Sequence, residues 1–263
     1  VVFRYIEDAR AANPDLKIIV ADPRRTESAE IADLHLPIKP GSDIALFNGM
    51  LHVLIGEGLV DQAYVAAHTS GFDALADIVK NYSPDKVAAI CGIPADAIVQ
   101  AARWFGASEA SLSLYCQGLN QSAHGTHNNA GIIHLHLATG QIGKPGAGPF
   151  SLTGQPNAMG GREVGGLSNL LSAHRDLANP EHRAEVARLW GIPEVPAKPG
   201  KAAVNLFQAL KTGEVKAVWI ACTNPVQSLP NQAAVREALQ AAEYVVVQET
   251  YGNTDTAAYA DLL

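Results

Sequence analysis

The sequence has few cysteines, and they are far apart. Cys91, Cys116 and Cys222 are scattered over 263 residues without a C-x-x-C pair. An odd number of isolated cysteines argues against a disulfide framework and against a local metal site built on thiolates. Such usage is typical of a reducing compartment, so we expect a cytoplasmic protein.

Charge is also scarce, and long apolar runs are missing. Charged residues make up 17% of the chain and the net charge is −7, with no run of lysine or arginine. Binding along a nucleic-acid backbone is therefore excluded as a main function. The longest apolar candidate, Ile44 to Ile55, is interrupted by Asn48 and His52, so we expect no membrane span.

Glycine, in contrast, is concentrated in one place. The stretch from Thr139 to Gly166 holds nine of the 23 glycines and has neither a helical nor a strand period. Glycine allows the backbone to adopt positive φ and to approach a ligand closely. We interpret the stretch as an ordered loop that closes over a large polar ligand, and an interdomain linker is the alternative. The polar side chains that could serve such a loop are Gln141, Lys144, Ser151, Thr153, Gln155, Asn157, Arg162 and Glu163.

Short apolar strands alternate with helical segments along the chain. The strands are expected at Lys17–Ala21, Leu34–Ile38, Ser111–Tyr115, Lys216–Ala221 and Tyr244–Val247. This alternation predicts an α/β fold with parallel-type sheets flanked by helices. We expect two Rossmann-like halves, residues 1–150 and 151–263, joined by the glycine-rich stretch.

Four of these strands run directly into polar residues. The exits are Asp22-Pro23-Arg24-Arg25-Thr26, Gln117 to Gln121, Cys222 to Ser228, and Gln248-Glu249-Thr250. Ligands of open parallel sheets bind beyond the carboxyl ends of the strands, so the pattern predicts one extended polar ligand or two. The alternative for the first exit is helix capping by Asp22 or Thr26 beside two solvated arginines. Gly41-Ser42-Asp43 opens a further helix, where Ser42 or Asp43 could cap the helix or a carboxylate could accept paired N–H donors.

Familiar motifs do not explain this pattern. The glycine spacing fits neither G-x-G-x-x-G nor the P-loop, and no G-x-S-x-G is present. Four histidines lie close in sequence (His124, His127, His134 and His136), but His134 and His136 cannot share a helix face. We therefore predict no metal site on this chain's own side chains.

Five segments, in order, resemble the molybdopterin oxidoreductases that carry a bis(guanine dinucleotide) cofactor, most closely the assimilatory nitrate reductases. The segments are residues 21–43 (ADPRRTESAEIADLHLPIKPGSD), 115–130 (YCQGLNQSAHGTHNNA), 135–166 (LHLATGQIGKPGAGPFSLTGQPNAMGGREVGG), 219–231 (WIACTNPVQSLPN) and 245–263 (VVVQETYGNTDTAAYADLL).

The resemblance implies a molybdenum bis(molybdopterin guanine dinucleotide) gripped by two α/β halves. By match to family motifs, Asp22, Pro23, Arg24, Arg25, Thr26, Gly41, Ser42 and Asp43 would contact one guanosine end. Gln117 and Gln121 would lie near the pterin and the metal, and Asn224, Gln248 and Glu249 would contact the second dinucleotide. Arg162, with Gln155 nearby, would line the substrate funnel, where a forked guanidinium suits a planar anion.

The function that the resemblance implies is two-electron reduction of nitrate to nitrite by oxygen-atom transfer, as in nitrate assimilation. The electron donor would be ferredoxin, flavodoxin or a nicotinamide-linked subunit. The chain starts at Val1 and stops at Leu263, and none of Cys91, Cys116 and Cys222 lies where the family has its 4Fe-4S cysteines or its molybdenum ligand, so we expect a central fragment. Its 4Fe-4S cluster and its molybdenum ligand would lie outside this segment, and the fragment alone would be inactive. Formate dehydrogenase of the same family, or a non-catalytic nucleotide-binding module, remain alternatives.

Overall fold

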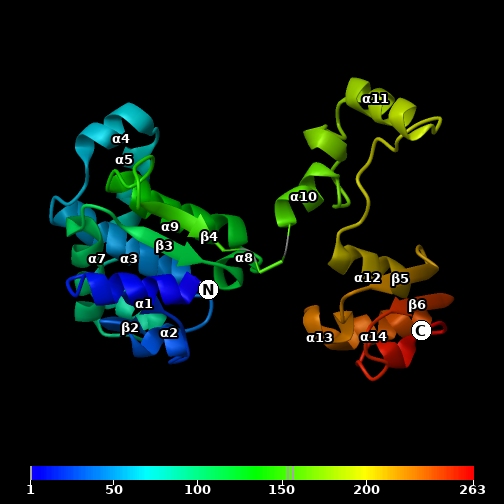
Figure 1. The fold of residues 1–263 in the computed structure, drawn as a ribbon, viewed down its shortest axis with the longest axis horizontal. Coiled ribbons are helices and arrows are strands. Elements are labelled where there is room, and N and C mark those ends of the chain that lie inside the picture. The colour runs from blue at the N-terminus through cyan, green and yellow to red at the C-terminus, as the bar shows by residue number, and fades with distance from the viewer. Residues whose placement is uncertain (1, 153, 156) are drawn as a thin grey trace. The chain divides into compact units, whose positions relative to one another are not determined.

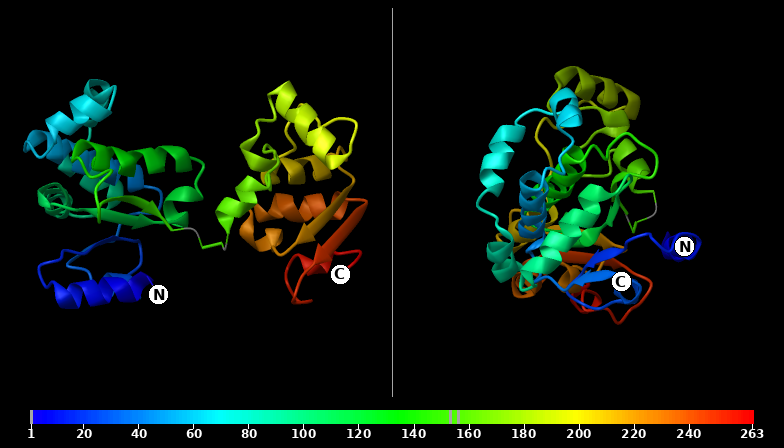
Figure 2. Two further views of the ribbon diagram at one scale, coloured as in Figure 1. Left: turned by 45° about the horizontal axis from the view of Figure 1, so that its top comes forward. Right: turned by 90° about the vertical axis from the view of Figure 1, so that its left-hand side faces the viewer.

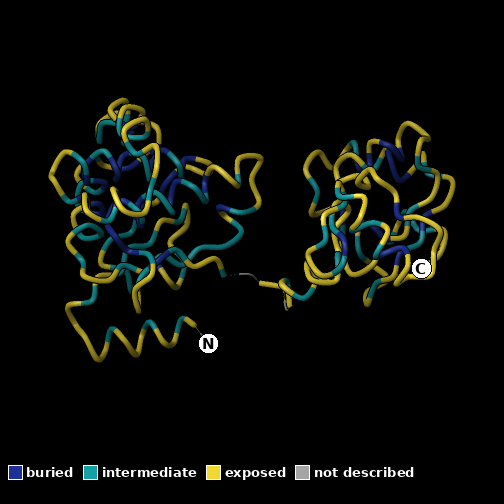
Figure 3. Tube along the Cα trace, turned by 90° about the horizontal axis from the view of Figure 1, so that it is seen from above, coloured by how far each residue is buried: buried dark blue, intermediate teal, exposed yellow. Residues whose placement is uncertain are grey.

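The computed structural model describes residues 2–152, 154–155 and 157–263. The chain forms two compact units, the first ending at Gly154 and the second running from Gln155 to Leu263 (Figure 1). Figure 3 shows that each unit has its own buried segments, in dark blue. Thr153 and Pro156 of the glycine-rich stretch lie outside the described residues.

The first unit combines two parallel strand pairs with a set of helices. Its elements are α1 (Val2–Ala12), β1 (Ile19–Ala21), α2 (Glu27–Glu30), β2 (Leu34–Leu36), α3 (Asp43–Gly56), α4 (Gln62–His68), α5 (Phe72–Val79), α6 (Pro84–Cys91), α7 (Ala95–Ala107), β3 (Leu112–Tyr115), α8 (Gln117–Asn120), α9 (Gly125–Ala138) and β4 (Gly148–Ser151). β1 pairs with β2, and β3 pairs with β4. Figure 2 shows α9 running over the β3–β4 pair.

Helix α3 is the centre of the first unit's core. It is apolar on nearly all sides, which is the pattern of a helix surrounded by other elements. It packs against α5, α6, α7 and α9, and Leu46, Leu51 and Leu54 are fully buried. At 25 cal/mol per Å² of apolar surface, each buried leucine contributes on the order of 2 kcal/mol to folding.

The second unit is smaller and holds one parallel pair. Its elements are α10 (Ala158–Glu163), the 3₁₀ turn η1 (Ser172–His174), α11 (Pro180–Trp190), α12 (Ala203–Lys211), β5 (Ala217–Ala221), α13 (Pro225–Ser228), α14 (Gln232–Ala241), β6 (Tyr244–Gln248) and the 3₁₀ turn η2 (Ala257–Tyr259). Helices α12 and α14 pack on each other, and their apolar faces share a core with β5 and β6. Trp219 on β5 stays 71% exposed, because the strand buries only alternate side chains.

The predicted fold class is confirmed: both units are α/β, with short parallel sheets flanked by helices. One local expectation was wrong, because residues 117–121 are a helical turn closed by Gln121 and not an open loop.

The glycine-rich stretch is neither one irregular loop nor only a linker. It contains β4 and α10, and the boundary between the two units falls inside it. The strand was missed because Gly148 and Pro149 are poor strand formers, and pairing with β3 overrides that preference. No helix in the described parts of the chain is both long and apolar enough to cross a membrane.

Candidate functional site

The exit of β1 is a turn built by Asp22. Its Oδ1 accepts a hydrogen bond from the Arg24 N–H at 2.7 Å, and its own N–H donates to the Leu36 carbonyl at 3.2 Å. Thr26 precedes α2 without a side-chain capping bond. The capping alternative therefore fails for α2, because Asp22 organises its own loop. Pro23, Arg24 and Arg25 are exposed, so both guanidinium groups are available to an anion.

The start of α3 places a carboxylate in a half-buried position. Gly41 has φ +82°, a conformation that favours glycine, and no atom lies within 4 Å of the place where a Cβ would stand. The chain therefore turns at Gly41 and leaves the space beside it open. Ser42 does not cap α3, since its Oγ donates to the Lys39 carbonyl at 2.6 Å. Asp43 follows in the first helical turn, and burial raises the pKa of its carboxyl. Among the described residues no cation pairs with it, so the carboxylate can still accept N–H donors from a ligand.

The exit of β3 is tied to β4 by amide side chains that the sequence did not single out. Asn129 donates to Asn120 Oδ1 at 3.0 Å, and Asn120 in turn donates to Ser151 Oγ at 3.1 Å. This chain of hydrogen bonds positions α8, on which the predicted residue Gln117 is half-buried, with the predicted residue Gln121 exposed at its end. Residue spacing alone could not reveal a link from α9 through α8 to β4.

The exits of β5 and β6 lie side by side in the second unit. The parallel register pairs Ala221 with Gln248, and the next N–H, of Cys222, donates to the Gln248 carbonyl at 3.2 Å. The Gln248 side chain is exposed, and Glu249 accepts from the Thr250 N–H at 2.7 Å through Oε1. Asn224 is bound to the buried Thr256, a residue that the sequence did not indicate, with Oδ1 accepting from its hydroxyl at 2.6 Å.

Arg162 and Gln155, the expected substrate-funnel residues, both lie in the second unit. Arg162 is exposed in the last turn of α10, and Gln155 is exposed ahead of that helix. Asn157 begins the helix at φ 55°, and its Oδ1 accepts from the Gly160 N–H at 3.2 Å. The structure therefore places these two residues in the same unit as Asn224, Gln248 and Glu249, and it places the other expected contacts in the first unit.

The histidines do not form a cluster of ligands. Among the described residues, no group of three or more His, Cys, Asp or Glu side chains could hold a metal ion. His136 is fully buried instead, and its Nε2 lies 2.7 Å from Ser113 Oγ on β3. Its Nδ1 meets no hydrogen-bond partner in the described part of the chain, and burial lowers the pKa of the ring to about 4.

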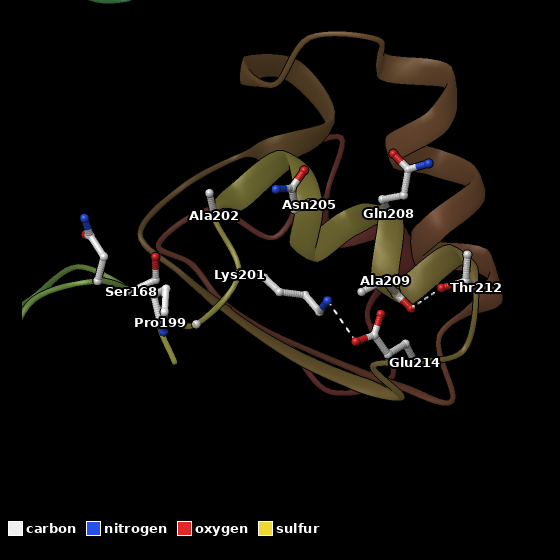
Figure 4. Close-up of a pocket in the computed structure, with 11 residues that line it drawn as sticks. Ser168, Pro199, Lys201, Ala202, Asn205, Gln208, Ala209, Thr212 and Glu214 are labelled. Carbon is white, nitrogen blue, oxygen red and sulfur yellow. Dashed lines mark hydrogen bonds and ion pairs between the residues drawn. The ribbon is translucent and has the colours of Figure 1, made fainter. Parts of the chain in front are cut away.

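A cavity of about 700 Å³ lies elsewhere in the second unit, between residues 168–169, residues 199–202 and α12 (Figure 4). Lys201 Nζ and Glu214 Oε1 form an ion pair at 2.8 Å at its edge. None of the residues predicted for the cofactor or the substrate lines it. The predicted residues thus lie outside this cavity.

Comparison with known proteins decides the family. The sequence profile of the family described as "Molybdopterin oxidoreductase" matches residues 2–263. The chain belongs to the molybdopterin oxidoreductase family. The expected family is therefore confirmed, and membership implies a molybdopterin cofactor.

The relatives within the molybdopterin oxidoreductases include two kinds of enzyme. A nitrate reductase of Synechocystis sp. is 46% identical over 265 residues, covering 100% of this chain and 37% of that protein. Formate dehydrogenase H of Escherichia coli is 38% identical over 247 residues, covering 94% of this chain and 34% of that protein. Among solved structures, acetylene hydratase of Pelobacter acetylenicus matches with a TM-score of 0.70 and 25% identity, over 99% of this chain and 38% of that one. The chain spans about a third of the length of the relatives it matches.

The donor set at the strand ends fits a molybdopterin cofactor of this family. Such a group presents phosphate oxygens and ring N–H and C=O groups. Two exposed guanidinium groups follow β1, a half-buried carboxylate opens α3, and amide side chains follow β3, β5 and β6. Each of these groups is complementary to one kind of polar atom on the cofactor.

Proposed function

We propose that this chain is the central cofactor-binding segment of a molybdenum enzyme that reduces nitrate to nitrite. The observation that carries the proposal is 46% identity to a nitrate reductase along the whole chain. The cofactor is proposed to be the bis(molybdopterin guanine dinucleotide) form, with a 4Fe-4S cluster held by parts of the enzyme outside this chain. When bound, the molybdenum group would supply the two-electron oxygen-atom-transfer chemistry that converts nitrate to nitrite.

The chain's own residues hold the two ends of that cofactor. Asp43 suits a guanine ring, because a carboxylate in a partly dry site accepts two parallel N–H bonds more strongly than it would in water. Arg24 and Arg25 neutralise phosphate charge. Gln117 and Gln121 line the pterin side, and the residues after β5 and β6 bind the second dinucleotide.

Arg162 attracts and orients nitrate. Its guanidinium offers two parallel N–H donors that match two oxygens of a planar anion. Gln155 adds a neutral donor nearby in sequence. The enzyme is proposed to act in the cytoplasm, taking electrons from ferredoxin, flavodoxin or a nicotinamide-linked subunit.

Formate oxidation is the second candidate function, because formate dehydrogenase H is a relative over 94% of the chain. Formate is also a small planar anion that a guanidinium can bind. The two functions differ in the direction of electron flow and share the cofactor. A non-catalytic nucleotide-binding module would neither transfer electrons nor contain the molybdenum cofactor.

The test uses the full-length enzyme, purified from a host that makes the cofactor. Molybdenum content, nitrate-dependent oxidation of reduced viologen and formate-dependent dye reduction are measured on one sample. We expect molybdenum with nitrate turnover, and Arg162→Ala should raise the KM for nitrate by roughly tenfold or more at unchanged molybdenum content. Arg188→Ala, which removes one exposed arginine from α11 of the same unit, is the matched control and should leave KM unchanged. Turnover of formate alone would move the function to the second candidate, and a folded enzyme without molybdenum would refute both.

A further inference from the structure

In the hydrogen bonds that join Asn224, Val226 and Thr256 after β5, the donor and acceptor of each bond are fixed. Thr256 is 0% exposed, and its backbone N–H, which can only donate, lies 3.2 Å from Asn224 Oδ1. The Val226 N–H donates to Thr256 Oγ1 at 3.1 Å, so the hydroxyl proton is left to donate to Asn224 Oδ1 at 2.6 Å. Two donors therefore converge on one side-chain atom of Asn224, and that atom must be its oxygen.

The amide side chains of the loop consequently turn donors outward. With its oxygen held by Thr256, Asn224 turns its NH₂ group away and donates to Gln227 Oε1 at 3.2 Å. That bond fixes the oxygen of Gln227 as well, so the exposed Gln227 presents its own NH₂ group. No other side-chain acceptor among the described residues meets these two NH₂ groups.

The surroundings favour a neutral acceptor over a phosphate. Residues 222–228 carry no charged side chain, and residues 248–255, after β6, carry Glu249 and Asp255 with no lysine or arginine. The register of β5 and β6 brings these two segments together. A phosphate would meet like charge there without a cation to compensate, whereas a ring carbonyl would not.

We propose that the loop after β5 is a donor-only site for a neutral ring carbonyl of the cofactor, that Gln227 binds this carbonyl together with Asn224, and that Thr256 is the positioning residue that sets their direction. The inference rests on the proposed function, since the ligand is the bound dinucleotide. It adds two residues, Gln227 and Thr256, to the expected contacts.

The experiment compares isosteric variants of the full-length enzyme from a cofactor-producing host. The readouts are guanine nucleotide released by acid per polypeptide, molybdenum per polypeptide, and the melting temperature. Asn224→Asp keeps the oxygen that Thr256 holds and replaces the outward donor by an acceptor. Gln227→Glu likewise replaces a donor by an acceptor, at the residue that accepts the hydrogen bond from Asn224. Gln240→Glu adds the same charge at an exposed position of α14 and is the control.

We expect Asn224→Asp and Gln227→Glu each to lower the bound guanine nucleotide roughly tenfold or more, with Gln240→Glu at the wild-type level. Thr256→Val, which lacks the hydroxyl, should lose nucleotide too, and Thr256→Ser, which keeps it, should restore the wild-type content. Should Thr256→Val fail to fold, Asn224→Asp still decides, because it keeps every inward hydrogen bond.

Full nucleotide content in Asn224→Asp, or in Gln227→Glu, would overturn the donor-only site. Loss in Thr256→Ser equal to that in Thr256→Val would overturn the positioning role. A wild-type enzyme that contains no guanine nucleotide would instead refute the proposed function, and this inference with it. The guanine nucleotide content of the wild-type enzyme thus distinguishes failure of the proposed function from failure of the donor-only site.

Discussion

Cys222 adopts a backbone conformation that suits glycine better than cysteine. Its φ is +60°, and its side chain is exposed, directly after β5. For a residue with a Cβ this left-handed conformation costs roughly 1–2 kcal/mol relative to the right-handed one. The strain is held by the neighbouring strand, since the Cys222 N–H donates to the Gln248 carbonyl at 3.2 Å.

Cys222→Gly should therefore stabilise the protein. The relief of strain exceeds the extra chain entropy of glycine, so we expect a gain of up to about 1 kcal/mol in the free energy of unfolding. Urea unfolding at equilibrium measures it. Ala221→Gly is the control, because Ala221 lies in β5 directly before Cys222 and should lose stability when glycine replaces it in the strand. Equal losses in the two variants would contradict the explanation.

His136 makes stability depend on pH. Burial lowers the pKa of its ring from 6.5 to about 4 in the folded protein. The unfolded chain therefore binds more protons between these values, and stability is complete above pH 6.5 and is lost as the pH falls toward 4. Each pKa unit corresponds to about 1.4 kcal/mol, so the loss is about 3 kcal/mol at most.

His136→Gln should abolish that part of the pH dependence. Glutamine does not titrate and can still hydrogen-bond to Ser113. Unfolding free energies of wild type and variant, measured from pH 7 to about pH 4, should converge as the pH falls, because the other titrating groups cancel in the difference. His124→Gln changes an exposed ring and should leave the wild-type profile intact. Parallel profiles for wild type and His136→Gln would show that His136 does not couple to folding.

At the scale of one helix, α3 contains two glycines with opposite roles. Gly49 is buried, and a Cβ there would come within 2.9 Å of Val87 Cγ2 on α6. Gly56 is exposed in the last turn of the same helix, and a Cβ there would meet nothing within 4 Å. Gly49 is thus required by packing, whereas Gly56 only weakens the helix.

Alanine at the two positions should change stability in opposite directions. Gly49→Ala should cost about 1–3 kcal/mol through overpacking against α6, and Gly56→Ala should gain about 0.5–1 kcal/mol through helix propensity. Both are measured by thermal or urea unfolding. Val87→Ala combined with Gly49→Ala should recover part of the loss, and additive losses in that double variant would refute the contact as the cause.

The same scale shows what the sequence could and could not predict. Strands such as β3 and β5 were predicted to within one residue of their bounds, because short apolar runs mark them clearly. α8 was missed because four residues with Gly118 among them have no period to read. Asn224 was predicted as a contact, but Thr256, 32 positions away, was not. Their bond depends on how the chain returns after β6, and no local pattern records that return.

At the scale of the molecule, two units with separate cores predict separable responses to core damage. Leu54 on α3 and Leu210 on α12 are both 0% exposed, and each belongs to the core of its own unit. Leu→Ala at such a site costs about 2–5 kcal/mol, because apolar burial is lost and a cavity remains.

Hydrogen exchange shows which unit loses stability, because amides exchange through the opening of cooperative units. Leu54→Ala should speed exchange in β1, α3 and α9, and Leu210→Ala in β5, α14 and β6. Equal acceleration in both units from either substitution would mean that the chain unfolds as one cooperative body, and the two cores would then not be energetically independent.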